Sequence, residues 1–188
     1  MKRTHMTTLL VVALMLSLPV LAACGESASS HLQQGNELTR AGEYAQAVEE
    51  YEAALKLEPE NVDVLTNLGV VLYQLGQPSL AIESYNKAVA LAPGDADIRS
   101  NLAAAYVQLY EPGGATDSLD MALEQYQKAI ELQPNLAEAH YGTGVVYYLQ
   151  GQIDQAIAAF VKFQEMDTGT DQQATQNAEA ILQELRGQ

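Results

Sequence analysis

The chain of 188 residues offers few side chains whose type and spacing could do chemistry, and its histidines are the first candidates. A zinc site needs three or four His, Cys or carboxylate ligands in one place. His31 and His140 lie far apart in the sequence, each at a position expected to pack between helices, so we expect no metal site. No Ser, His and Asp arrangement predicts a nucleophile, and Gly113-Gly114 predicts a turn, not a phosphate-binding loop. The sequence therefore predicts no active site and no cofactor, and we expect that the protein is not an enzyme.

The only cysteine of the chain, Cys24, follows an N-terminal segment typical of export. Lys2 and Arg3 give this segment a basic start, and residues 9–18 are almost wholly apolar. The apolar stretch is too short for a comfortable membrane span, so it predicts a signal peptide over residues 1–23. Because there is one cysteine, a disulfide within the chain is excluded.

The four residues Leu21-Ala22-Ala23-Cys24 resemble the lipobox of bacterial lipoproteins. The resemblance implies that Cys24 becomes a lipidated N-terminus that anchors the protein in the bacterial cell envelope, on the extracytoplasmic side of the inner or the outer membrane. The alternative is an ordinary signal peptide, or an uncleaved anchor, with an incidental cysteine. Residues 24–30 are small and polar, and we expect them to form a short, flexible tether.

Acidic residues outnumber basic ones, with 24 Asp and Glu against 9 Lys and Arg and a net charge of −15. This balance argues against a nucleic-acid partner, because phosphates require neutralisation by Lys and Arg. It also disfavours contact of the protein surface with anionic lipid. We therefore expect the lipid anchor to be the only contact with the membrane.

The rest of the chain repeats itself. Tyr51 recurs at Tyr85 after 34 residues and at Tyr126 after a further 41. Seven residues have therefore been inserted into the third copy, between Tyr106 and Leu119. The period divides the chain into four units, over residues 28–61, 62–95, 96–136 and 137–170.

Each unit is predicted to form two helices. In the second unit, Leu65, Leu68 and Leu72 share one face of the first helix, and Pro78 opens the second. Gly69 is expected, with Ala81, where the two helices cross closely, because a larger side chain would hold them apart.

Residues 171–186 predict one more amphipathic helix, with Ala178, Leu182 and Leu185 on its apolar face. Repeat arrays need such a helix, with a polar outer side, to cover the apolar edge of the last unit.

This pattern resembles the tetratricopeptide repeat family, whose period is also 34 residues. In the first unit, the residues at the marked positions of the family are Gly35, Leu38, Ala47, Tyr51, Ala54 and Pro59. The fourth unit departs from the pattern at Phe163 and Thr168, as expected of a terminal unit. The resemblance covers about residues 28–170. It implies an all-α solenoid of about four helix-turn-helix repeats plus a C-terminal capping helix.

The resemblance also implies a function, because the family binds a peptide or helix of a partner protein in a concave groove lined by the first helices of successive units. By repeat position, this groove should show Asn36, Arg40, Thr66, Val70, Tyr73, Gln74, Ser100, Ala104, Val107, Gln108, Tyr141, Val145, Tyr148 and Leu149. Tyrosine, apolar and amide groups suit an apolar or amide-rich segment. The alternative is that Tyr73 and Tyr148 only complete the packing between units.

Some members of the family hold a chaperone C-terminus in a two-carboxylate clamp of Lys, Asn and Arg. Asn36 and Asn67 match that pattern. The positions that need cations hold Leu32, Asp97 and Asn101, so we do not expect this clamp.

Two functions from different classes stay open. The first is an adaptor or assembly factor that docks a protein partner in the groove near the membrane. The second is a constitutive structural subunit of a larger envelope complex, bound through its convex faces or its ends. The insertion at residues 110–117 is expected to be a loop, with Asp117 or Ser118 capping the next helix, and is either a recognition element or a tolerated insertion without a role.

Overall fold

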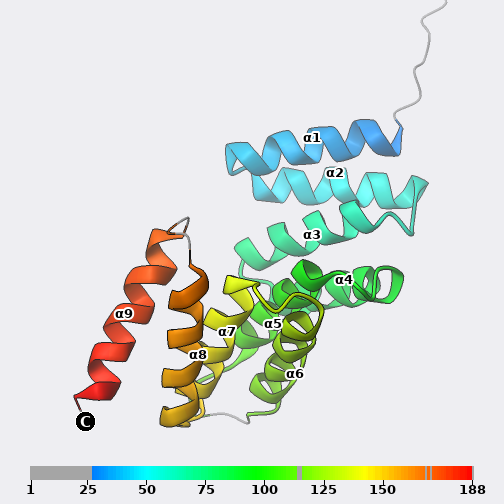
Figure 1. The fold of residues 1–188 in the computed structure, drawn as a ribbon. Helices are drawn as coiled ribbons and strands as arrows, with labels where there is room; N and C mark the ends of the chain where they lie inside the picture. The colour runs from blue at the N-terminus through cyan, green and yellow to red at the C-terminus, as the bar shows by residue number, and fades with distance from the viewer. Residues whose placement is uncertain (1–26, 114–115, 168, 170, 188) are drawn as a thin grey trace, which may run out of the picture.

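The computed structural model describes residues 27–113, 116–167, 169 and 171–187, and within them it contains helices and turns but no strand (Figure 1). The helices are α1 (Ala28–Ala41), α2 (Tyr44–Leu57), α3 (Val62–Gln74), α4 (Pro78–Leu91), α5 (Ala96–Leu109), α6 (Asp117–Leu132), α7 (Ala137–Leu149), α8 (Ile153–Met166) and α9 (Gln172–Arg186). None of these helices has the length and hydropathy that crossing a membrane requires. The expected signal peptide and Cys24 lie outside the described residues.

The helices pack in pairs, and the pairs stack in chain order. The pairs are α1 with α2, α3 with α4, α5 with α6, and α7 with α8. The second helix of each pair packs on the first helix of the next, and α8 packs on α9. The first helices also touch one another along the array, α1 with α3, α3 with α5, and α5 with α7. We call the surface formed by α1, α3, α5 and α7 the first-helix face. The predicted all-α solenoid is confirmed.

A glycine in the first helix makes room for an aromatic ring from the second. A Cβ added to Gly69 would lie 2.5 Å from Cε1 of Tyr85, and one added to Gly35 would lie 2.6 Å from Cε1 of Tyr51. Real Cβ atoms do not approach carbon this closely, so the ring can occupy this space only because the glycine has no side chain. The close contact predicted at Gly69 is therefore confirmed, and its partner is the Tyr85 ring.

In the third unit, the aromatic ring of the second helix does not pack against a glycine of its own first helix. This unit has Ala103 at the position of Gly35 and Gly69. Its ring, Tyr126, lies instead against Gly142 of α7, where an added Cβ would be 2.1 Å from Cζ of the tyrosine. Tyr126 thus joins the third unit to the fourth.

The turn between the two helices of a unit requires a left-handed residue. Gly42, Gly76 and Gly151 occupy this position in the first, second and fourth units, with φ of +77°, +68° and +72°. The third unit has Tyr110 at this point, with φ of −68°. A tyrosine is strained in the left-handed region, so the chain cannot turn there in the same way. The insertion supplies its own left-handed residue three positions later, Gly113, with φ of +84°.

Two predicted boundaries were wrong. Asp117 is the first residue of α6 and not the last residue of the loop, and neither it nor Ser118 caps the helix, because the capping position is Thr116, which makes no side-chain cap. At the other end, residues 28–30 of the expected tether are helical. Ser27 accepts a hydrogen bond from the Ser30 amide and so caps α1, which begins at Ala28, the first residue of the predicted first unit.

The predicted capping helix is α9. Its residues Ala178, Leu182 and Leu185 are buried in one cluster with Phe160 and Phe163 of α8. Asp171 caps it by accepting from the Ala174 amide. This helix covers the last pair of the array, as predicted.

Candidate binding face

A hollow of about 280 Å³ opens on the first-helix face, between α1, α3 and α5. We call it the inner hollow. It is lined by Leu32, Asn36, Val62, Asp63, Thr66, Asn67, Asp95, Asp97 and Ile98. A second hollow of about 300 Å³ adjoins it along α1 and α3, where Arg40, Tyr51 and Val70 join Asn36 and Asn67.

Two asparagines bridge α1 and α3 at the boundary of these hollows. Asn67 donates from Nδ2 to Oδ1 of Asn36 at 2.9 Å, and the hydroxyl of Tyr51 donates to the same oxygen at 2.8 Å. Both acceptor sites of the Asn36 carbonyl are therefore used. Within the described residues, Nδ2 of Asn36 and Oδ1 of Asn67 make no hydrogen bond, so one donor and one acceptor stay open toward the face.

Two of the packed tyrosines, Tyr51 and Tyr85, have raised pKa values, and only Tyr51 has a hydrogen-bond partner among the described residues. Tyr51 has Asn36 as its acceptor, and Thr39 Oγ1 lies 3.0 Å away. Burial raises the pKa of Tyr51, partly offset by Thr39 and by the charge of Arg40. Burial also raises the pKa of Tyr85, so this group is neutral at physiological pH.

Nearly all of the predicted groove residues are at least partly open. Arg40, Gln74, Gln108 and Leu149 are exposed, and nine of the others are half-buried. Ser100 is the exception, because the residue is only 8% exposed and so contributes little to an open groove. Gln108 donates from Nε2 to the backbone oxygen of Tyr73 at 3.2 Å, which ties α5 to the end of α3.

Tyr73, Tyr141 and Tyr148 each take part in core packing as well as facing outward. Tyr73 packs against the cluster of the first two units, and Tyr148 against that of the last. Tyr141 contacts the rings of Phe160 and Phe163 edge-on, with centroids 5.8 and 5.3 Å apart. The structural role that the sequence left open for Tyr73 and Tyr148 is therefore present, and it leaves part of each ring exposed.

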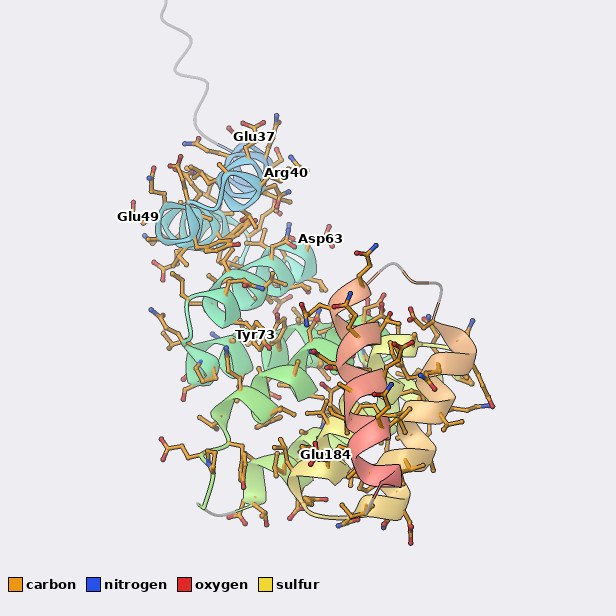
Figure 2. The ribbon with its side chains drawn as sticks, turned by 90° about the vertical axis from the view of Figure 1, so that its left-hand side faces the viewer. Glu37, Arg40, Glu49, Asp63, Tyr73 and Glu184 are labelled. Atoms are coloured by element: carbon orange, nitrogen blue, oxygen red, sulfur yellow. The ribbon has the colours of Figure 1, made fainter. Side chains whose placement is uncertain are left out.

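Carboxylates on the first-helix face were the functional candidates that sequence reasoning missed. Asp63 and Asp97 both line the inner hollow, one repeat apart, and neither makes an ion pair with a described residue. Glu138 stands at the same repeat position in α7. In Figure 2, Asp63 projects on the opposite side of the array from Glu49 of α2. The recurrence of an acid at the second residue of α3, α5 and α7 was the signal that could have revealed them.

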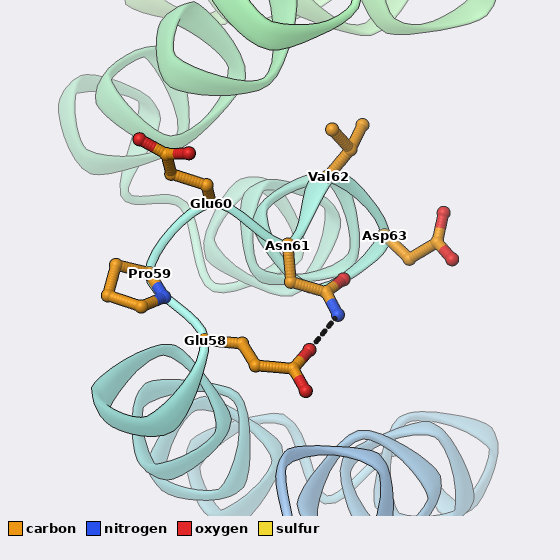
Figure 3. A pocket seen from close by; sticks show the side chains of 6 residues that line it. All are labelled: Glu58, Pro59, Glu60, Asn61, Val62 and Asp63. Carbon is orange, nitrogen blue, oxygen red and sulfur yellow. Dashed lines mark hydrogen bonds between the residues drawn. The ribbon is translucent and has the colours of Figure 1, made fainter.

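A larger hollow, of about 600 Å³, lies at the turn between α2 and α3, lined by residues 58–63 (Figure 3). Asn61 uses both ends of its amide there, since Oδ1 accepts from the Val64 amide and Nδ2 donates to Oε2 of Glu58. The polar groups of this turn thus cap a helix, and they leave no set of groups poised for a ligand.

The histidines do not come together. His31 of α1 places Nδ1 2.7 Å from Oε2 of Glu50, and His140 of α7 places Nε2 2.9 Å from the backbone oxygen of Pro134. His31 thus joins α1 to α2, and His140 joins α7 to the turn that precedes it. Within the described residues, no group of three or more His, Cys, Asp or Glu side chains could hold a metal ion.

Comparison with known proteins gives a consistent result. Three family models match, described as tetratricopeptide repeat over residues 32–96, TPR repeat over 117–151, and tetratricopeptide repeat over 138–166. No match was found among curated proteins. The stretch that these models leave unmatched between their first and second ranges, residues 97–116, holds most of α5 and the insertion.

Solved structures of three proteins are similar to this chain over most of its length. A MamA protein has 28% identity and a TM-score of 0.70, with 87% of this chain and 88% of that chain covered. TTC0263, a thermophilic TPR protein in Thermus thermophilus, has 28% identity and a TM-score of 0.68, with 84% and 80% covered. YrrB, described as a TPR protein with an unusual peptide-binding site, has 25% identity and a TM-score of 0.63, with 83% and 76% covered.

The paired helices, the glycine-to-ring contacts and these matches agree on one architecture. Domains of this type bind protein or peptide partners. The chain therefore carries tetratricopeptide repeats, and it folds as an all-α solenoid of the tetratricopeptide type.

Proposed function

We propose that this protein is a membrane-anchored, extracytoplasmic interaction adaptor that holds a partner peptide or helix on its first-helix face. The observation that carries the proposal is the pair of adjoining hollows across α1, α3 and α5, with an open amide donor and acceptor between them. A surface that combines apolar walls with a few unsatisfied polar groups is typical of a binding site. The protein acts by binding, without turnover.

A matched pair of double variants tests the use of this face. Val70→Glu with Ala104→Glu places charge on α3 and α5, one repeat apart. Leu57→Glu with Leu91→Glu places the same charge, also one repeat apart, at the ends of α2 and α4. Partner capture should be lost in the first variant and kept in the second, provided that both retain helical circular dichroism.

The alternative, a structural subunit held through its outer helices, has one observation in its favour. Large apolar side chains stand exposed on α2, α4 and α6, with Leu57 and Met121 about half exposed and Leu80 and Leu132 close to it. If the outer Leu57 and Leu91 variant alone loses its partner, this function replaces the adaptor.

The anchor rests on the run Leu21-Ala22-Ala23-Cys24 behind an apolar segment. We propose that Cys24 carries the acyl chains and that they are the sole attachment to the membrane. In the Cys24→Ser variant, incorporation of labelled fatty acid should vanish and the precursor should stay uncleaved. Labelled lipid on the Ser variant would refute this part of the proposal, and the adaptor function would be unaffected.

A further inference from the structure

The inner hollow is acidic, and no cation from the described residues balances it. Asp63 of α3 and Asp97 of α5 stand on its wall with exposed side chains, one repeat apart, and make no ion pair with a described residue. The third acid of the wall, Asp95, is already used, because Oδ1 accepts from the Ile98 amide at 3.0 Å and caps α5. The nearest arginine of α5, Arg99, points elsewhere, since it donates to the Pro93 oxygen and to Gln125.

Acidic residues in the first turn of a helix also stabilise the helix dipole, and this accounts for part of their presence. It does not account for the other open groups of the same hollow. Nδ2 of Asn36 and Oδ1 of Asn67 have no partner in the described residues. Because the other ends of the two amides are joined by a hydrogen bond, this donor and this acceptor lie side by side. Such a pair matches the C=O and N–H groups of a polypeptide main chain.

A buried polar group one unit along adds an independent observation. The Tyr85 side chain is 2% exposed, and its hydroxyl makes no hydrogen bond with a described residue. Its equivalent, Tyr51, donates to Asn36, but the second unit has Val70 at that position. Thr66 Oγ1 is the only side-chain oxygen or nitrogen in the described residues that is both enclosed and without a hydrogen-bond partner. Because the hydroxyl of Tyr85 also has no hydrogen-bond partner in the described residues, it cannot be fully enclosed.

Thr66 Oγ1 belongs to the wall of the inner hollow itself. Buried polar atoms in proteins are almost always hydrogen-bonded. The surface of the hollow thus combines unpaired carboxylates with open amide groups, and the unpaired Thr66 hydroxyl is enclosed behind it.

We propose that the inner hollow binds an extended segment of a partner protein through a lysine or arginine side chain placed between Asp63 and Asp97. The main chain of that segment hydrogen-bonds to the open groups of Asn36 and Asn67. The partner is recognised by its positive charge, which complements the acidic wall. This inference rests on the proposed function, since it names the chemistry of the segment that the first-helix face binds.

Selection of peptides on the intact protein tests the inference. The full 188-residue chain, purified in detergent and immobilised, is used to select from a random peptide display library, and the enriched peptides are measured by fluorescence anisotropy. The test variant is Asp63→Asn with Asp97→Asn. The matched control is Glu49→Gln with Glu83→Gln, which removes the same charge from exposed residues one repeat apart on α2 and α4.

The expected result is that enriched peptides share a lysine or arginine. The test variant should bind them about tenfold more weakly, as two solvent-exposed ion pairs allow, and the control should bind as the unmodified chain does. Binding to the unmodified chain should also weaken as salt is raised, which keeps the inference testable if the double variant fails to fold.

Two other outcomes separate the inference from the proposed function. Peptides that lack a basic residue, but whose binding is lost in the variant Val70→Glu with Ala104→Glu, would overturn the inference and leave the adaptor function standing. Failure to enrich any peptide whose binding depends on the first-helix face would overturn both.

Discussion

At the scale of single residues, the glycines of the first helices determine how closely the two helices of a unit pack. Gly69 has no side chain, and the ring of Tyr85 occupies the space that a Cβ would need. The same contact recurs between Gly35 and Tyr51. Each tyrosine ring can therefore pack at this position only because the facing residue is a glycine without a side chain.

Gly69→Ala should lower the free energy of unfolding by about 1–3 kcal/mol, the usual effect of overpacking a core. The control is Gly94→Ala, because a Cβ there meets nothing within 4 Å and the residue does not have a positive φ. Gly94→Ala should change stability by about 0.5 kcal/mol or less. Gly113 is unsuitable as a control, since its φ of +84° strains any side chain. Equal urea midpoints for the two variants would contradict the proposed packing.

We also expect the stability of the fold to depend on pH, because two of its tyrosines are buried. Burial raises the pKa of Tyr85 and Tyr126 above the ordinary value of 10.0, so the folded state favours the neutral form. Their contribution to stability is complete below about pH 10, the pKa of an unfolded tyrosine, and is lost as the pH rises from there toward the raised values.

We therefore expect the urea midpoint to fall above about pH 10, because Tyr85 and Tyr126 ionise more readily in the unfolded chain than in the folded one. A variant with Tyr85→Phe and Tyr126→Phe should be less sensitive to alkaline pH than the unmodified chain. If both chains lose stability equally between neutral pH and high pH, other groups determine the alkaline transition.

At the scale of helices and turns, the third unit is the irregular one, and it departs from the other units in two places. Tyr110 replaces the left-handed glycine of the other turns, and Tyr126 packs on Gly142 of the next unit, while its own unit has Ala103. The sequence showed where the extra residues lie because the period breaks between Tyr106 and Leu119.

Deletion of residues 111–117 restores the 34-residue period, and its effect should depend on Tyr110. With Tyr110→Gly the shortened turn can adopt the left-handed geometry of Gly76, and the chain should fold. With Tyr110 retained, the shortened chain should be less stable by about 1–2 kcal/mol, the cost of a left-handed non-glycine residue. Thermal unfolding of both deletion variants measures the difference. Equal stability would mean that the turn does not require the left-handed conformation.

Helix pairs, unit boundaries and the capping helix could be predicted from the sequence because a strict period places apolar residues on one face of each helix. The end of the tether and the cap of α6 could not, since several neighbouring Ser, Thr and Asp residues can each serve as a cap and packing selects among them.

The binding face was only partly predictable. Repeat position placed thirteen of the predicted groove residues on a surface that is at least partly open, but not Ser100. The open groups of Asn36 and Asn67 depend on the hydrogen bonds that join α1 to α2 and to α3, which a pattern of residue types does not contain. The sequence does not bring Asp63 and Asp97 together, because their shared hollow forms only when α3 and α5 are packed together.

At the scale of the whole molecule, stability is expected to depend on contacts between neighbouring units and on the ends of the array. The helix α9 buries Leu182 and Leu185 against the last pair. A chain that ends at Gly169 should lose about 2 kcal/mol or more in the stability of α7 and α8, since two leucines and their aromatic partners return to water. Hydrogen exchange should increase in α7 and α8 and stay unchanged in α1 to α4. A uniform increase over all helices would contradict the view that the units interact only with their neighbours.

The central claim is that a partner protein lies on the first-helix face. The most direct measurement is photo-crosslinking in the cells that make the protein, with a photoreactive amino acid at Gln74 or Gln108 on that face, and at Leu57 or Leu91 on α2 or α4 as the comparison. All four side chains are exposed, so each position can react with a protein that touches it. The proposed function predicts a single crosslinked species at Gln74 and Gln108 that is absent at Leu57 and Leu91. Crosslinks at Leu57 and Leu91 alone would contradict it and would assign the protein's contacts to its outer helices.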